Sequence, residues 1–327
     1  MKTTRLVSIG ALCVLSTFSV SGQAPSAPRT PWGDPDLQGT WTSEAELSVP
    51  FERPREFGDR QLLTDQEFTT RRSQVQRQLD SDNSDFDLET ADRSNAGAVG
   101  SATSPPPHWL ERGKPSRRTS LVIDPPDGRI PALTAEGQRR AQEARGTFGA
   151  NGAFNNAAFR GPEDLSLWER CIARGLPGAI FPTVYNANTR IVQGPGYVAI
   201  TYEMIHDTRI IPTDKRSHLP ASIRGYFGDS QGRWDGDTLV VDVTNFTDRT
   251  AYRGSRDTLH LIERFTRVGS TLRYEVTVDD PHTWTKPWTA ALDLTPQPET
   301  MFEYACHEGN NSMRNILSAA RAAEKRQ

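Results

Sequence analysis

From Leu165 onward, short runs with β-strand character alternate with turn residues at close intervals. Gly194-Pro-Gly196 and Asp235-Gly-Asp237 are two of these turns, and their residue types favour tight reversals of the chain. Many short strands joined by tight turns predict a mainly β protein built as an antiparallel barrel or sandwich. The predicted strands are 189–193, 197–211, 225–227, 238–246, 258–268, 271–279, 290–294 and 301–306.

Residues 271–279 give the clearest strand pattern. Leu272, Tyr274, Val276 and Val278 alternate with charged or hydroxyl-bearing residues. This period of two predicts one buried face and one solvated face. A barrel over residues 165–310 accounts for the pattern.

The N-terminus has the features of a secretory signal peptide over residues 1–22. Lys2 and Arg5 precede an uncharged, mostly apolar run, and small residues follow it. The run is too short for a stable membrane span, although an uncleaved N-terminal anchor remains an alternative. We therefore expect a periplasmic or secreted protein with no stable membrane insertion after cleavage.

Export places the two remaining cysteines, Cys171 and Cys306, in an oxidising compartment. A disulfide between them is expected, and two separate buried thiols are the alternative. The net charge of −3 and the lack of a basic cluster argue against a nucleic-acid partner.

Residues 23–164 form an N-terminal extension with short helices, the first strands and one mobile loop. Thr64-Asp-Gln-Glu67 is a capping box and predicts a helix to about Leu79. The acidic, small-residue segment 80–107 is predicted to be a mobile loop, with a lid over a pocket as an alternative to a plain solvated insertion. Further predictions are a strand at 120–124, a helix at 134–145 and an amphipathic C-terminal helix at 311–327.

Several motifs together resemble a family of exported bacterial proteins, common in acidobacteria and proteobacteria, whose domain has no assigned function. The resemblance implies export and a β-rich, calycin-like or lipocalin-like barrel with peripheral helices. It transfers no residue roles. Gly39-Thr-Trp41 also resembles the opening strand of lipocalin-like barrels, in which the Trp closes one end. The motifs of the family are Pro35–Trp41, Leu165–Cys171, Glu203–Asp207, Gly228–Trp234, Gly236–Val241, Asp280–Trp288 and Tyr304–Asn310.

The predicted strand 197–211 carries ionisable residues among apolar ones. Such groups are costly on a core-facing strand unless they are paired or used in chemistry. Strand alternation places Tyr202 and His206 on one face, with Glu203 and Asp207 on the other. We expect His206 to act as a general acid or base beside Tyr202, and a hydrogen-bonded structural histidine is the alternative.

Three further residues extend this candidate site. Arg209 and His260 are expected to stabilise developing charge, and His218 in the following loop is a candidate for substrate binding together with Glu203 and Asp207. No metal-binding motif is present, so no metal is assigned. A divalent ion between His206, His218 and His260 is nevertheless an alternative if the three converge.

Two other motifs have structural alternatives. Gly228-Asp-Ser-Gln-Gly232 matches Gly-x-Ser-x-Gly, but no helix is predicted after it, so Ser230 is rejected as a nucleophile. Trp284 and Trp288 are candidates for stacking against a sugar or aromatic ring, and a hydrophobic plug at a barrel end is the alternative.

These features predict an exported enzyme that uses acid–base chemistry without an organic cofactor. Its substrate would be a small, partly apolar molecule such as an aromatic ether or a sugar derivative, and its reaction that of a lyase, isomerase or hydrolase. No nucleotide-binding motif is present, which argues against hydride or phosphoryl transfer. The alternatives are a lipocalin-like binding protein and a structural envelope protein.

Overall fold

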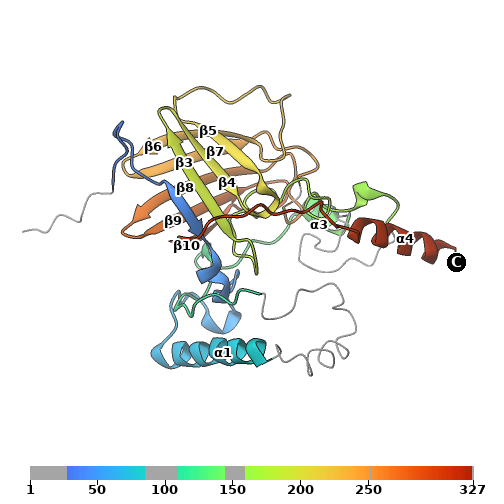
Figure 1. Cartoon of the computed structure of the whole chain (residues 1–327), viewed down its shortest axis with the longest axis horizontal. Helices are drawn as coiled ribbons and strands as arrows, with labels where there is room; N and C mark the ends of the chain where they lie inside the picture. The colour runs from blue at the N-terminus through green and yellow to red at the C-terminus, as the bar shows by residue number, and fades with distance from the viewer. Residues whose placement is uncertain (1–27, 85–109, 144–158, 251, 326–327) are drawn as a thin grey trace, which may run out of the picture.

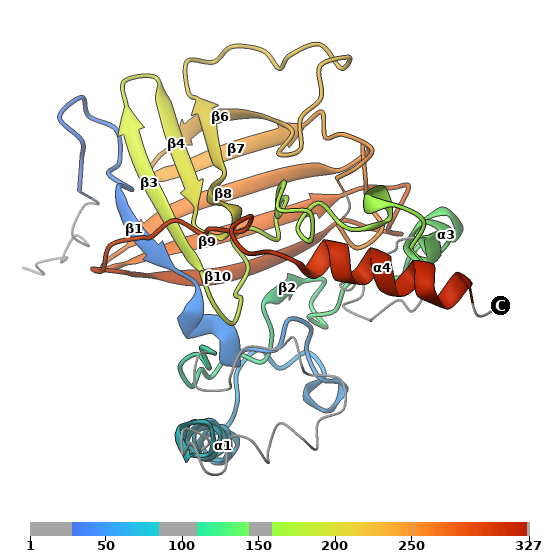
Figure 2. The ribbon, with the colours of Figure 1, turned by 45° about the vertical axis from the view of Figure 1, so that its right-hand side comes forward.

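The chain folds around one antiparallel sheet that curls into a nearly closed barrel (Figures 1 and 2). The computed structural model describes residues 28–84, 110–143, 159–250 and 252–325. The strand order is β5-β4-β3-β1-β10-β9-β8-β7-β6, with β2 paired to β10. The prediction of a mainly β, calycin-like barrel is confirmed. The strands are β1 Gly39–Thr42, β2 Val122–Asp124, β3 Asn188–Gly194, β4 Tyr197–Tyr202, β5 Thr208–Pro212, β6 Asp229–Asp235, β7 Thr238–Thr244, β8 His260–Val268, β9 Thr271–Asp279 and β10 Trp288–Pro296.

The barrel has one seam, between the terminal strands β5 and β6, which are not hydrogen-bonded neighbours in the sheet. The two strands nevertheless lie close together there. A Cβ atom added to Gly232 of β6 would lie 2.9 Å from the side chain of Ile211 in β5. Gly232 therefore allows the two edges to approach.

Most strand predictions are confirmed, but the predicted strand 197–211 is divided into β4 and β5 by η5. Residues 225–227 and 301–306 form no strand, and β6 was missed. Apart from Trp234, β6 holds only polar residues and glycine, because it is a strand at the seam. The barrel also extends beyond 165–310, since β1 inserts between β3 and β10.

Side chains from alternating strand positions fill the barrel. Leu272, Tyr274, Val276 and Val278 are fully buried, as their spacing predicts. Trp41 is buried next to β10, donates its indole N–H to the Leu37 carbonyl at 3.0 Å, and lies under the guanidinium of Arg267.

The helices lie outside the barrel. They are α1 Asp65–Ser84, α3 Ala135–Glu143 and α4 Ser312–Glu324, with short 3-10 turns η1 Glu44–Ser48, η2 Arg55–Phe57, η4 Pro162–Asp164 and η5 Met204–His206. The capping box of α1 is confirmed: the Thr64 N–H donates to Glu67 at 2.8 Å and the Glu67 N–H donates to the Thr64 hydroxyl at 3.3 Å. α1 continues to Ser84, five residues past the predicted end.

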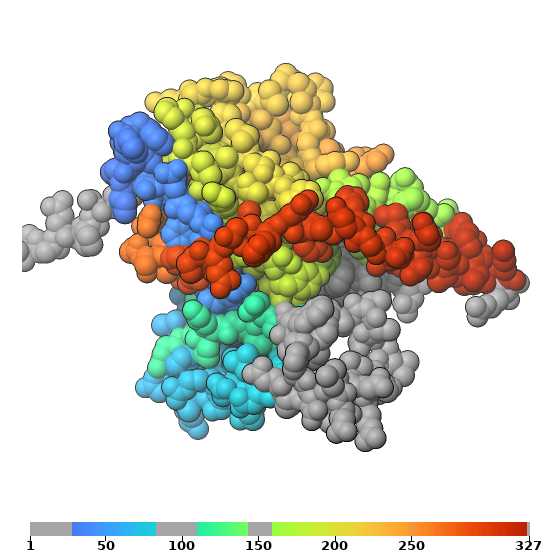
Figure 3. All heavy atoms as spheres, viewed as in Figure 1, coloured from blue at the N-terminus to red at the C-terminus, as the bar shows by residue number. Residues whose placement is uncertain are grey.

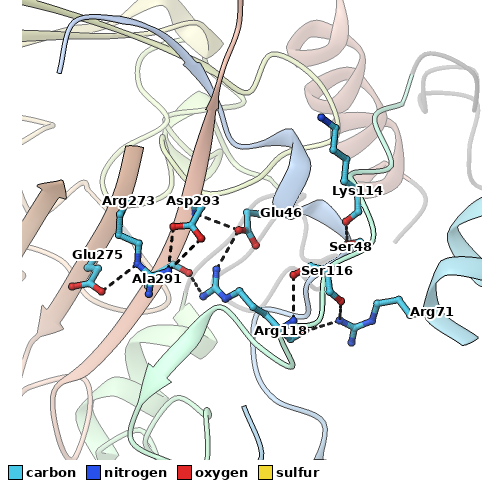
Figure 4. A network of polar contacts seen from close by, with 10 residues as sticks. All are labelled: Glu46, Ser48, Arg71, Lys114, Ser116, Arg118, Arg273, Glu275, Ala291 and Asp293. Atoms are coloured by element: carbon cyan, nitrogen blue, oxygen red, sulfur yellow. Dashed lines mark hydrogen bonds and ion pairs between the residues drawn. The ribbon is translucent and has the colours of Figure 1, made fainter. Parts of the chain in front are cut away.

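The segments that contain η1 and Arg118, both N-terminal to β2, are held against β10 by the buried Glu46 and by Arg118 (Figure 4). The Arg118 guanidinium lies 3.3 Å from the Glu46 carboxylate and also donates to the Ala291 carbonyl. The backbone N–H of Asp293 donates to the same carboxylate at 3.2 Å. Burial raises the pKa of Glu46, and Arg118 opposes that shift.

After β10, residues 297–311 cross the outside of the barrel as a strap, and α4 follows at its side (Figure 3). The Gln297 N–H donates to the Thr40 carbonyl at 2.8 Å. Further along, Cys306 forms a disulfide with Cys171, with their Cα atoms 5.7 Å apart. The predicted disulfide is confirmed, and it holds the strap to the segment before β3.

Two predictions fall on residues outside the described part of the chain. They are the signal peptide at 1–22 and most of the loop at 80–107, of which residues 85–107 are not described. Among the described residues, no helix is long and apolar enough to cross a membrane.

Candidate functional site

The predicted single strand 197–211 is wrong. β4 ends at Tyr202, the chain turns through η5, and β5 returns antiparallel to β4 from Thr208. Ile205 and His206 have φ values of 67° and 45°, in the left-handed region. Because this turn interrupts the alternation, Tyr202 and His206 do not share a strand face.

The turn sends the two residues to different places. Tyr202 is buried inside the barrel, with its ring stacked on Phe227 at 5.5 Å. His206 is exposed on the surface, where its Nδ1 lies 3.2 Å from the Tyr304 carbonyl oxygen of the strap. The sequence-based pairing of Tyr202 and His206 is therefore not formed.

A buried polar cluster occupies the barrel interior around Arg209. Its guanidinium contacts both carboxylate oxygens of Glu263, at 2.5 and 3.2 Å, and reaches the Ser230 hydroxyl at 3.3 Å. The Tyr274 hydroxyl donates to Glu263 at 2.8 Å. Since Arg209 comes from β5, Ser230 from β6 and Glu263 from β8, these contacts bridge the seam of the barrel.

This interior cluster is poorly suited to proton transfer. Burial raises the pKa of Tyr202, and the Arg209 charge only partly offsets the shift. Among the described residues, the Tyr202 hydroxyl and the Arg209 Nε have no hydrogen-bond partner. The two depressions described, of about 380 and 170 Å³, are lined by other residues, so the cluster is best explained as a structural link across the seam.

A second polar cluster, which we call the histidine cluster, lies on the outer face of the barrel. It consists of His218, Asp229, Asp242 and His260. The inward positions of β7 are taken by Leu239, Val241 and Val243, which directs Asp242 outward. The same alternation directs Asp229 in β6 and His260 in β8 outward.

Short contacts connect the four side chains in a row. His218 Nδ1 lies 2.6 Å from an Asp229 oxygen, and His218 Nε2 lies 3.0 Å from Asp242 Oδ1. His260 Nε2 lies 3.3 Å from each oxygen of the Asp242 carboxylate. The Leu219 N–H also donates to Asp229, at 3.0 Å, which fixes that carboxylate beside His218.

The row of contacts constrains the protons. Ionised carboxylates only accept hydrogen bonds, so each ring nitrogen that faces one must donate. Both ring nitrogens of His218 face a carboxylate oxygen, so a proton can pass between the ring and either carboxylate. The side chains of His218 and His260 are 31% and 36% exposed, so solvent and small molecules reach them.

The histidine cluster brings together His218 and His260 of the sequence-based candidates but not His206. No group of three or more His, Cys, Asp or Glu side chains in the described parts of the chain has the arrangement to hold a metal ion. The alternative of a divalent ion between His206, His218 and His260 is therefore not supported, since His206 lies at the strap, apart from the other two.

The other candidates have structural contacts. Glu203 is buried and accepts the Asn188 N–H at 3.2 Å, while Asp207 accepts the Thr208 N–H at 2.9 Å. Trp284 and Trp288 are buried edge to face, with ring centroids 5.8 Å apart. Trp284 also lines a depression of about 170 Å³.

Ser230 lies in the middle of β6 with its side chain buried beside Arg209. No helix follows this strand, since β7 begins three residues after β6 ends. The rejection of Ser230 as a nucleophile therefore agrees with the strand-turn-strand geometry around it.

Sequence reasoning missed both carboxylates of the histidine cluster. Asp242 carried a usable signal, because it is the single acidic residue inside the apolar run of β7. Asp229 carried none, because the strand β6 was itself not recognised.

Comparison of the chain with protein-family models found no match, and comparison with curated proteins found no significant similarity.

Proposed function

We propose that the protein is an exported enzyme that uses acid–base chemistry without an organic cofactor, and that the histidine cluster is its catalytic centre. The observation that supports this most is the contact of His218 with two carboxylates, at 2.6 and 3.0 Å. Two imidazoles and two carboxylates in contact provide both a proton donor and a proton acceptor at one place.

Each member of the cluster has a distinct task in this proposal. Asp229, fixed by the Leu219 N–H, orients the His218 ring and stabilises its positive charge. His218 then delivers a proton from Nε2 to the leaving oxygen of a substrate that displaces the contact with Asp242. Asp242 takes a proton from the attacking group or the substrate carbon, and His260 steadies its charge.

The reaction class follows from what these groups supply. A general acid beside a general base favours cleavage of a C–O bond, by hydrolysis or by elimination. The cluster is partly exposed on the outer face of the barrel, so the reacting bond has to project from a small molecule. Aryl glycosides and aryl ethers, which are partly apolar, fit the substrate class expected from the sequence.

The proposal is tested by screening purified protein against aryl glycosides and aryl ethers, with release of the phenol as the signal. The variants are His218→Gln and His260→Gln, and the matched control is His282→Gln, which replaces an exposed histidine outside the cluster. Turnover that the first two variants lose and the control keeps supports the proposal. Turnover that survives in all three would locate catalysis elsewhere.

A ligand-binding role in the barrel interior is the second candidate. It is favoured by the buried Tyr202 hydroxyl and Arg209 Nε, which have no partner among the described residues and are suited to a ligand oxygen. Titration of wild type and Tyr202→Phe with a carboxylate-bearing aromatic ligand tests it. Equal affinity of the two proteins would remove the interior as the binding site.

A further inference from the structure

A depression lined by three arginines lies between η2 and the segment that follows β2, and it shares no lining residue with the histidine cluster. Its volume is about 380 Å³. Arg53, Arg55 and Arg129 contribute the positive charge, and Asp127 is the single acidic residue among the lining side chains. We call this feature the arginine depression.

Arg53 is the unusual member, because it is only 1% exposed and yet its side-chain hydrogen bonds to the described residues all go to neutral oxygens. Its Nε donates to the Thr119 hydroxyl at 2.9 Å, and its Nη1 donates to the carbonyls of Pro126 and Gly58 at 2.5 and 3.3 Å. A buried charge is normally paired with an opposite charge. These neutral acceptors orient the guanidinium without neutralising it.

The surrounding backbone is shaped to hold this guanidinium. Gly128 has a φ of +67°, and a Cβ atom there would lie 2.8 Å from the guanidinium carbon of Arg53. Arg129 donates from Nη1 to the Arg53 carbonyl at 2.8 Å, which places the second arginine beside the first. Arg55 is exposed at the start of η2 and lines the same depression.

We propose that the arginine depression binds an oxyanion: a phosphate, sulfate or carboxylate group, either as the free ion or as part of a small organic molecule. Arginine side chains present forked N–H donors that match the oxygens of such groups, often two at a time. The bound anion would supply the negative charge that Arg53 lacks. The Asp127 carboxylate, which lines the same depression, would weaken binding because it repels the anion.

The test is calorimetric titration of the full chain with inorganic phosphate, sulfate and benzoate in separate experiments at low ionic strength. We expect at least one of them to bind in the millimolar range or tighter. Tighter binding of phosphate or sulfate identifies an inorganic-type oxyanion, and tighter binding of benzoate identifies an organic carboxylate. Failure of all three anions to bind the wild-type protein would overturn the proposal.

Substitutions of the lining residues test whether the anion binds in the arginine depression. Arg55→Gln and Arg129→Gln should each weaken binding by about fivefold or more, because each removes one charge next to the anion. Asp127→Asn keeps the oxygen that accepts the Arg129 backbone N–H at 3.1 Å and should tighten binding by about threefold. Arg233→Gln removes an exposed arginine on β6 and serves as the matched control.

If all the variants bind the anion with the wild-type affinity, any observed binding occurs elsewhere, and the proposed site is wrong. Thermal melting of each variant checks that it remains folded. Phosphate should also raise the melting temperature of the wild type more than that of Arg55→Gln.

Discussion

Arg209 and Glu263 form a two-point ion pair inside the barrel, and the pair spans the seam that backbone hydrogen bonding leaves between β5 and β6. Both side chains are almost fully buried. The ion pair therefore connects the two sides of the seam, as backbone hydrogen bonds connect neighbouring strands elsewhere in the sheet.

Breaking this pair on one side should be costly. Glu263→Gln leaves the Arg209 charge buried without a counter-charge, and we expect it to lower the free energy of unfolding by about 3–5 kcal/mol. The double variant Arg209→Met/Glu263→Leu removes both charges and should recover much of the loss. Urea denaturation measures both, and a double variant no better than the single one would contradict this account of the seam.

Loss of the hydroxyl should have different effects on the free energy of unfolding at two buried tyrosines. Tyr274→Phe removes a hydrogen bond to the charged Glu263 and should destabilise the protein by about 1.5–3 kcal/mol. Tyr202→Phe removes a buried hydroxyl without a partner among the described residues, so it should be neutral or stabilising by up to about 1 kcal/mol. Equal losses in the two denaturation curves would contradict the assigned contacts.

The disulfide should stabilise the folded state chiefly by lowering the conformational entropy of the unfolded chain. Cys171 and Cys306 are 135 residues apart, so their link restricts a long loop when the protein unfolds. Replacing both cysteines by serine should cost about 2–4 kcal/mol. Limited proteolysis should then cut the strap at 297–311 earlier than in wild type. An unchanged melting temperature and cleavage pattern would show that the strap is held by other contacts.

Glu44 provides a pH-dependent test of stability. Its pKa is raised from 4.5 to about 6 by burial, with repulsion from Glu111, Glu203 and Glu299 adding to the shift. Between these two values the folded state holds more protons than the unfolded state, so the free energy of unfolding falls as the pH rises. Above about pH 6, the pKa of Glu44 in the folded state, this contribution to the free energy of unfolding is lost completely.

Glu44→Gln should remove this contribution, because the amide does not titrate. The variant should be more stable than wild type above pH 6, and the difference should disappear as the pH falls below 4.5. Thermal melting across this pH range is the measurement. A difference that grows toward low pH would have the opposite sign and would refute the assignment.

The barrel could be predicted from the sequence because its long strands follow a strict alternation. Leu272, Tyr274, Val276 and Val278 define β9 by themselves, and the capping box at Thr64 defines the start of α1. β6 was not predictable in the same way, since an edge strand at a seam does not need a full apolar face.

The interior and outer clusters were predictable only in part. The run from Gly196 to Pro212 looks like one strand, because Ile205 is a β-former and nothing in the run marks a turn. The structure nevertheless places Ile205 and His206 in the left-handed region, where few non-glycine residues occur. One missed turn was enough to separate Tyr202 from His206. The convergence of His218 with Asp229 and Asp242 was not predictable, because it depends on the loop after β5 lying against β6 and β7.

The central proposal is that the histidine cluster performs acid–base catalysis. Its most direct test is the ratio of kcat/KM between His218→Gln and wild type on an aryl substrate that the screen identifies, measured beside the melting temperatures of both proteins. We predict that kcat/KM falls by about 10²–10⁴-fold, as expected for the loss of a general acid, while the melting temperature changes little and the His282→Gln control stays active. A variant that keeps the wild-type kcat/KM, or one that loses activity only because it unfolds, would contradict the proposal.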